Sequence, residues 1–202
     1  LSLHDALPIL TVTRKVTIIT DSAADLPQEI ALHRSIRVVP LYVTLGDETF
    51  KDGVELSPEE LYHKMKIDKA VPRTSQPSPE DFHQAFEGAA TDILCLTISA
   101  NLSGTNQSAE LSKELLTDPV QIDIYNTKNA SLGEGIKVLI ADDLAQAGHS
   151  ACEIIDKLDA VKLRTVFTVE HLQYLERGGR VSKTQATVAA VLDIKPILTM
   201  SP

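Results

Sequence analysis

The sequence predicts an α/β fold in which a mainly parallel sheet is covered by helices on both faces. Apolar, β-branched segments alternate with helical segments along most of the chain. The segments VTIIT at 16–20 and ILCLTI at 93–98 are almost continuously apolar, which is typical of strands buried on both faces. After residue 160 this alternation changes, and we expect a smaller α+β domain to begin there.

The first half of the chain is predicted to alternate between strands and helices. Strands are expected at 16–20 and 36–45, and helices at 25–33 with Asp25 as the cap, from Ser57, and from Ser78. At both serines a capping hydroxyl precedes a proline in the first helical position. The polar segment 68–77 between these two helices contains two prolines and is predicted to be a surface loop.

The second half repeats the alternation of strands and helices up to about residue 160, after which the pattern changes. Strands are expected at 92–98, 120–125, 164–169 and 195–200, and helices at 103–116, 130–147, from Ser150, at 170–177 and at 181–192. Gly178 and Gly179 follow the helix at 170–177, and we expect them to end it with a positive φ that glycine adopts cheaply.

Three parts of the chain are distinguished on this basis. Residues 1–15 are expected to be a non-native or disordered extension, since LSLHDALPIL resembles translated sequencing-adaptor read-through. Residues 16–160 are expected to form the α/β domain. Residues 161–202 are expected to be the beginning of a second domain that the sequence leaves incomplete, because no partner for the strand at 195–200 is expected anywhere in the sequence.

Composition and charge exclude several classes of partner. The 202 residues carry a net charge of −9, and no run of Lys or Arg exceeds two residues, which disfavours binding to nucleic acid. Apolar runs stay below the ~18 residues of a membrane span, so no stable membrane insertion is expected. The two cysteines, Cys95 and Cys152, lie in a strand-like and a helical segment, which favours reduced thiols and a cytoplasmic protein.

Hydroxyl-rich segments follow three of the predicted strands. They are Thr20-Asp21-Ser22, the segment 99–105 and the segment 126–135. In a parallel sheet, ligands collect at the carboxyl ends of the strands, where helix N-termini favour anions. Each serine alone can be a helix cap, but three such segments at one edge, with Thr74-Ser75-Gln76 in the flanking loop, favour a small anion site.

Motifs of common enzymes are missing from the sequence. It contains no G-x-S-x-G elbow and no phosphate-binding G-x-x-x-x-G-K-[ST], and Gly133-Glu134-Gly135 lacks the third glycine of a dinucleotide fingerprint. The six histidines are scattered without metal-ligand spacing, so no metal site is expected. Asp21 stands at a predicted strand end, where a single Asp is more often an orienting acceptor than a general base.

Several motifs together resemble the DegV family over residues 16–198. They are Thr20-Asp21-Ser22-x-x-Asp25-Leu26, Asp52-Gly53, Pro72-x-Thr74-Ser75-Gln76-Pro77-Ser78, Leu102-Ser103-Gly104-Thr105-x-Gln107-Ser108-Ala109, Ser131-x-Gly133-x-Gly135, Tyr174-Leu175-x-x-Gly178-Gly179-Arg180-Val181-Ser182 and Ile194-Lys195-Pro196-Ile197-Leu198. Their order and spacing make the resemblance specific.

The resemblance implies a Rossmann-like domain, a second smaller domain and a bound long-chain fatty acid such as palmitate. It implies a carrier that is not an enzyme and that presents the acyl carboxylate to a separate fatty-acid kinase, with no cofactor. The carboxylate-binding hydroxyls carry over to Thr74 and Ser103. Possible supporting residues are Asp21, Ser22, Ser75, Gly104, Thr105, Ser131 and Arg180. The chain departs from the family at Asn126, where an Asp is usual, and the family's later basic and histidine contacts lie beyond residue 202.

Two other functions remain open from the residues alone. The hydroxyl-rich sheet edge also suits an enzyme acting on a small phosphorylated or carboxylated metabolite. A DNA-binding regulator is the third reading, and the negative net charge disfavours it.

Overall fold

The computed structural model describes residues 14–68, 71–115, 120–170, 172–182 and 195–200. The helix expected at 181–192 therefore lies almost wholly outside the described residues, as do residues 1–13 of the expected extension. None of the described helices has the length and apolar character needed to cross a membrane.

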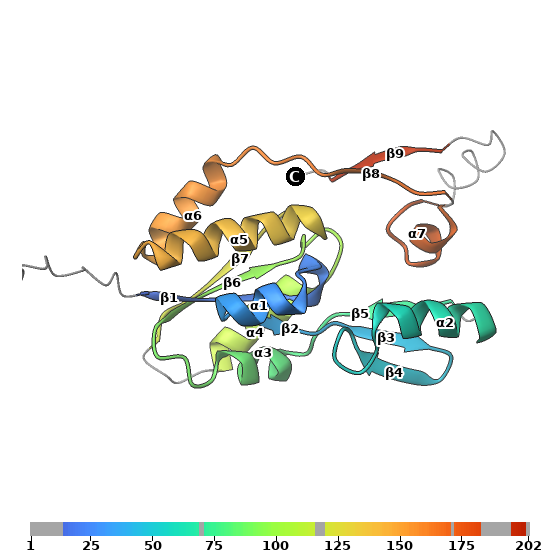
Figure 1. The fold of residues 1–202 in the computed structure, drawn as a ribbon, viewed down its shortest axis with the longest axis horizontal. Helices are drawn as coiled ribbons and strands as arrows, with labels where there is room; N and C mark the ends of the chain where they lie inside the picture. The colour runs from blue at the N-terminus through green and yellow to red at the C-terminus, as the bar shows by residue number, and fades with distance from the viewer. Residues whose placement is uncertain (1–13, 69–70, 116–119, 171, 183–194, 201–202) are drawn as a thin grey trace, which may run out of the picture.

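A four-stranded parallel sheet lies between the helices in the left-hand part of the molecule, as the alternating pattern predicts (Figure 1). Its strands in spatial order are β2 (Arg37–Val39), β1 (Val16–Asp21), β6 (Asp92–Thr97) and β7 (Ile122–Asn126). β1 pairs with β2 on one side and with β6 on the other, and β6 pairs with β7, all in parallel. The Rossmann-like arrangement expected for this part of the chain is confirmed.

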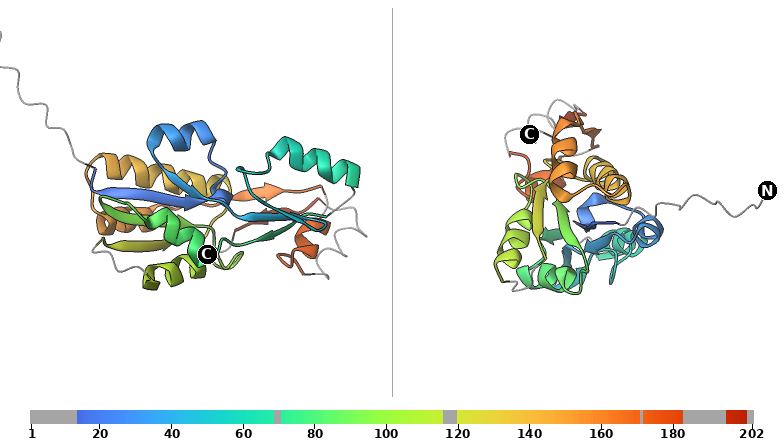
Figure 2. Two further views of the ribbon diagram at one scale, coloured as in Figure 1. Left: turned by 90° about the horizontal axis from the view of Figure 1, so that it is seen from below. Right: turned by 90° about the vertical axis from the view of Figure 1, so that its left-hand side faces the viewer.

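Helices cover both faces of this sheet, so consecutive residues of β1 contribute to two different cores (Figure 2). Ile18 packs with the first helical layer and Ile19 with the second. The first layer consists of α1 (Gln28–Arg34), α5 (Leu132–Gln146) and α6 (Ala151–Ala160), and the second of α3 (Pro79–Phe86) and α4 (Thr105–Leu115). Burial on both faces explains why these strands are apolar at nearly every position.

A second, antiparallel sheet corrects two expectations. Its order is β4 (Glu48–Lys51), β3 (Tyr42–Leu45) and β5 (Arg73–Ser75), and α2 (Pro58–Asp68) packs against it. The single strand expected at 36–45 is wrong: Pro40, which has no N–H to donate to a ladder, separates β2 of the main sheet from β3 of this one. The segment expected to be a loop at 68–77 contains β5, which pairs with β3.

After α6 the chain forms a third, two-stranded sheet. β8 (Val166–Thr168) pairs antiparallel with β9 (Ile197–Thr199), and α7 (Gln173–Arg177) lies between them in sequence. The expectation that the strand at 195–200 has no partner in the sequence is therefore wrong. Gly179 follows α7 with φ of +75°, whereas Gly178 has φ of −76°. The expected positive φ is thus found at Gly179 and not at Gly178.

The start of α1 differs from its prediction. Asp25 makes no cap for this helix; it ends a short 3₁₀ helix, η1 (Ser22–Ala24), in the left-handed conformation with φ of 50°. The residue before α1 is Pro27, which has no side chain able to accept a hydrogen bond. The caps predicted at Ser57 and Ser78 are confirmed: each hydroxyl accepts from the backbone N–H three residues later.

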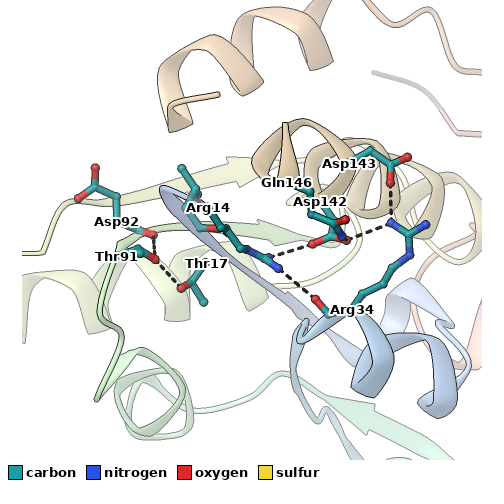
Figure 3. A network of polar contacts seen from close by, with 9 residues as sticks. Arg14, Thr17, Arg34, Thr91, Asp92, Asp142, Asp143 and Gln146 are labelled. Carbon is teal, nitrogen blue, oxygen red and sulfur yellow. Dashed lines mark hydrogen bonds and ion pairs between the residues drawn. The ribbon is translucent and has the colours of Figure 1, made fainter. Parts of the chain in front are cut away.

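An ion-pair network ties the beginning of β1 to two helices (Figure 3). Asp142 on α5 is fully buried and pairs with Arg14 at 2.9 Å and with Arg34 of α1 at 3.0 Å. Arg34 also pairs with Asp143, which is 64% exposed. Arg14, which lies in the expected extension 1–15, therefore contacts the folded part of the chain.

Candidate functional site

Hydrogen bonds join the three loops that follow β1, β6 and β7. The side-chain carboxylate of Asp21, the last residue of β1, accepts from Ile98 N at 2.8 Å and from Ala23 N at 3.0 Å. Ser99 N donates to the carbonyl of Asn129 at 2.8 Å. Ser131 N donates to the carbonyl of Ala23 at 2.7 Å. The sheet edge predicted to carry an anion site is therefore one connected structure, and Asp21 orients it as an acceptor.

The same edge concentrates unusual backbone conformations. Among the described residues other than glycine, four have a positive φ: Asp25, Ser35, Lys128 and Ser131. Three of these four lie in the loops after β1 and β7. Such conformations cost free energy and cluster at sites where loop geometry is held by the surrounding structure.

A buried pair of carboxyl groups lies beneath these loops. Asp21 and Glu134, which is in the first turn of α5, are both fully buried. Thr20 Oγ1 donates to Glu134 Oε1 at 3.3 Å, while Glu134 Oε2 meets no donor. Burial, followed by the charge of Asp21, raises the pKa of Glu134 to about 10. Burial also raises the pKa of Asp21 to about 6, although its hydrogen bonds act in the opposite direction.

Protonation of Glu134 allows the two buried carboxyl groups to lie side by side without charge repulsion. With a proton, its carboxyl becomes a donor, and Asp21 beside it is the acceptor. The glycines on either side of Glu134 are closely packed: a Cβ on Gly135 would come within 2.6 Å of the Ala24 carbonyl oxygen, and one on Gly133 would overlap the Thr165 hydroxyl and lie 2.8 Å from Asn129 Oδ1. The Gly133-Glu134-Gly135 motif therefore lets the start of α5 approach the neighbouring loops closely enough to bury Glu134.

Ser103 and Thr105 form a hydroxyl pair at the start of α4. Their oxygens are 2.8 Å apart, and either can donate. Thr105 is fully buried, whereas Ser103 is half-buried. Because Thr105 is held inside the protein, it fixes the Ser103 hydroxyl at the protein surface.

The strand that carries Thr74 and Ser75 reaches the same place from the second sheet. Thr74 pairs with Val43 across the β3–β5 ladder, and its exposed hydroxyl has no partner among the described residues. Two residues later, Gln76 Nε2 donates to Ser108 Oγ of α4 at 3.0 Å. The side chain of Gln76 also lies against Gly104. The structure thus brings the two predicted carboxylate-binding segments, around Thr74 and around Ser103, side by side.

Arg180 reaches this cluster from the end of α7. Its Nε donates to the carbonyl of Leu102 at 3.0 Å, and its Nη1 donates to the carbonyl of Gly178 at 2.5 Å. The left-handed turn at Gly179 thus directs a guanidinium group to the residue that precedes Ser103. Arg180 is exposed, but it is bound to this loop.

The remaining predicted residues lie in other contacts. Ser22 Oγ donates to Asp52 at 2.7 Å and accepts from Leu41 N at 3.0 Å, so its hydroxyl joins η1 to the residues that flank β3 and β4 of the second sheet. Ser131 precedes α5 without capping it, and Ser75 is exposed. The predicted site residues therefore fall into two sets. One set surrounds Ser103 and offers hydroxyls at the surface, and the other surrounds Asp21 and joins the loops of the sheet edge.

Two residues that the sequence analysis named only as parts of motifs, without a role of their own, complete this arrangement. They are Glu134, which lies beside Asp21, and Gln76, which links the Thr74 and Ser103 segments. The described residues contain no group of three or more His, Cys, Asp or Glu side chains able to hold a metal ion. A separate hollow beside α2 is lined by Phe50, Glu55, Leu56, Glu59, Glu60, His63 and Lys64. Its three glutamates outnumber the single lysine, and this net negative charge disfavours a carboxylate ligand.

Both the sequence and the fold are similar to those of known proteins. A family model described as "Uncharacterised protein, DegV family" matches residues 15–202. A DegV domain-containing protein of Caldanaerobacter subterraneus is 34% identical over 190 residues, which cover 92% of this chain and 67% of the relative.

Solved structures extend the comparison. The structure titled "Fatty Acid Binding of a DegV family Protein from Thermus thermophilus" is 40% identical, with a TM-score of 0.81 over 93% of this chain and 68% of that one. The Fatty Acid Kinase (Fak) B3 protein of Streptococcus pneumoniae, solved loaded with linoleic acid, is 27% identical, with a TM-score of 0.81 over 93% of this chain and 69% of that one. With its sequence motifs, its fold and the family model in agreement, the chain belongs to the DegV family.

Proposed function

We propose that this chain binds a long-chain fatty acid, such as palmitate, through its carboxylate, with the hydroxyls of Thr74 and Ser103 as donors. The observation that supports this most is the contact of Gln76 with Gly104 and Ser108, which places the two hydroxyl-bearing segments next to each other. The similar proteins of T. thermophilus and S. pneumoniae bind fatty acids.

Energetics assign different tasks to the tail and the head group. Burying about 16 carbons at ~0.8 kcal/mol each offers on the order of 12 kcal/mol before the costs of ordering are subtracted. Each hydroxyl-to-carboxylate hydrogen bond contributes ~1.5–3 kcal/mol. The tail therefore sets affinity, while Thr74 and Ser103 fix direction and compensate for the desolvation of a charge.

Arg180 adds a positive charge beside the proposed head-group site. Its guanidinium lies at the Leu102 carbonyl, one residue from Ser103, where a partner kinase could contact it. We place the acyl carboxylate at this surface, where a separate fatty-acid kinase could reach it in the cytoplasm. In this account the chain itself is a carrier and catalyses no reaction.

Removing both hydroxyls should weaken fatty-acid binding more than removing either. Thr74→Ala and Ser103→Ala should each lower affinity about tenfold, since each removes one hydrogen bond to a charged group. Because both hydroxyls contact one carboxylate, the effects should couple in a double-mutant cycle measured by calorimetry. Thr49→Ala, which removes an exposed hydroxyl from the same sheet, is the control. Unchanged binding in the double variant would remove this site assignment.

Substitution of Arg180 separates head-group binding from kinase recognition. If Arg180 serves the kinase, Arg180→Ala should leave the fatty-acid content intact and lower acyl phosphorylation by the kinase about tenfold or more, as for a lost charged contact at an interface. The measurement compares lipid content with phosphorylation rate at several kinase concentrations. A parallel loss of both would show instead that Arg180 acts on the carboxylate. If neither the lipid content nor the phosphorylation rate changed, Arg180 would serve only to hold the loop at Leu102 in place.

A further inference from the structure

Gln76 stands between the two proposed carboxylate-binding hydroxyls without being one of them. Its Nε2 donates to Ser108 Oγ, and Ser108 is 3% exposed in the first turns of α4. An exposed residue is thus anchored to a nearly buried acceptor. The hydrogen bond crosses from the second sheet, which carries β5, to the helix that follows β6 of the main sheet.

The same amide group occupies the space above Gly104. A Cβ on Gly104 would lie 2.7 Å from Gln76 Cδ and 2.8 Å from Nε2, and closer still to Oε1. Gly104 is absent from the glycines with a positive φ, so its backbone conformation does not require glycine. The requirement for a small residue at position 104 comes instead from the side chain of Gln76.

This double contact fixes one hydroxyl relative to the other. Thr74 precedes Gln76 by two residues, which is about 7 Å along a strand. Ser103 is the neighbour of Gly104 in sequence. Thr74 lies in β5 of the second sheet, whereas Ser103 lies in the loop that follows β6 of the main sheet. The contacts of Gln76 therefore tie these two segments together next to both hydroxyls.

We propose that Gln76 is a positioning residue that sets the separation of the Thr74 and Ser103 hydroxyls so that both bind one carboxylate. Gly104, which has no Cβ, leaves the space that the Gln76 amide occupies. This inference rests on the proposed function, because it assigns Gln76 a task in the same site. It goes further by naming a residue pair, Gln76 and Gly104, that acts on the head group without contacting it.

A cycle of three variants tests the proposal: Gln76→Ala, Gly104→Ala and the double variant. Each single change should lower affinity for palmitic acid about tenfold, the value of one hydrogen bond to a charged group. Gly104→Ala displaces the end of a flexible side chain rather than backbone, so the fold should persist. The double variant should bind palmitic acid no more weakly than either single variant, because both changes remove the Gln76 amide from its place above residue 104.

The affinity for methyl palmitate distinguishes a role in positioning the carboxylate-binding hydroxyls from a general role in maintaining the fold. This ester has the same tail and no carboxylate, so its binding should change less than twofold while the acid loses about tenfold. Gln84→Ala, an exposed glutamine of α3 that contacts Glu80, is the matched control and should change neither ligand. All affinities are measured by displacement of one fluorescent fatty acid, with melting curves recorded for each variant.

The possible outcomes distinguish this inference from the proposed function. If the unaltered protein binds palmitic acid no better than its ester, the proposed carboxylate site fails. If it prefers the acid, but the variants weaken acid and ester equally or the double variant adds the two single losses, the positioning role of Gln76 is overturned.

Discussion

Replacing Glu134 by glutamine should abolish most of the loss of stability that we expect as pH rises. Folded Glu134 keeps its proton up to a pKa of about 10, whereas an unfolded glutamate releases it near 4.5. Between these values unfolding releases a proton, so the free energy of unfolding falls with increasing pH, by up to about 1.4 kcal/mol per pH unit. Asp21, with its pKa raised from 3.8 to about 6, adds a loss of the same sign at the acidic end.

Glutamine at 134 retains an N–H₂ group that can donate to Asp21 and does not titrate. The unfolding free energy of Glu134→Gln, measured in urea from pH 6 to 9, should therefore be nearly flat and should exceed that of the unaltered protein at the alkaline end. Glu110→Gln, an exposed glutamate of α4, is the control and should keep the original slope. Parallel pH profiles for Glu134→Gln and the unaltered protein would show that Glu134 is not protonated in the fold.

Asp142→Ala should be among the most destabilising single changes in the chain. Its carboxylate is fully buried between Arg14 and Arg34, and its removal leaves two guanidinium groups without their shared partner. Breaking such a pair costs about 3 kcal/mol or more.

The neighbouring residue supplies the control. Asp143→Ala removes an acid that pairs with the same Arg34 but is 64% exposed, so it should cost under about 1 kcal/mol. The expected result is a lower urea midpoint for Asp142→Ala with an unchanged m-value. Equal midpoints for the two variants would mean that the Arg14–Asp142–Arg34 network does not stabilise the fold.

Local sequence signals predicted those elements whose structure depends on local interactions. The continuous apolar run of β6 and the proline that follows Ser78 each carry their information within a few residues. The strand at 92–97 and the helix that begins at Pro79 accordingly match their predictions. The resemblance to the DegV family located Thr74 and Ser103, which no periodicity would have distinguished from ordinary capping residues.

The elements that were missed depend on contacts between distant residues. β5 has three exposed residues and exists through its pairing with β3, about 30 positions earlier. Glu134 looks like a solvated acid in the first turn of a helix, and its burial follows from the approach of α5 to η1. Gln76 meets Gly104 across 28 positions, so its role was visible once both loops had been placed.

The most direct test of the proposed function is mass spectrometry of lipid extracted from the purified protein after bacterial expression. If the chain is a fatty-acid carrier, the extract should contain long-chain fatty acid, and Thr74→Ala/Ser103→Ala protein prepared in parallel should retain much less of it. An extract without fatty acid, together with turnover of a small phosphorylated or carboxylated metabolite, would contradict the account and show that the hydroxyl groups around Ser103 serve an enzyme.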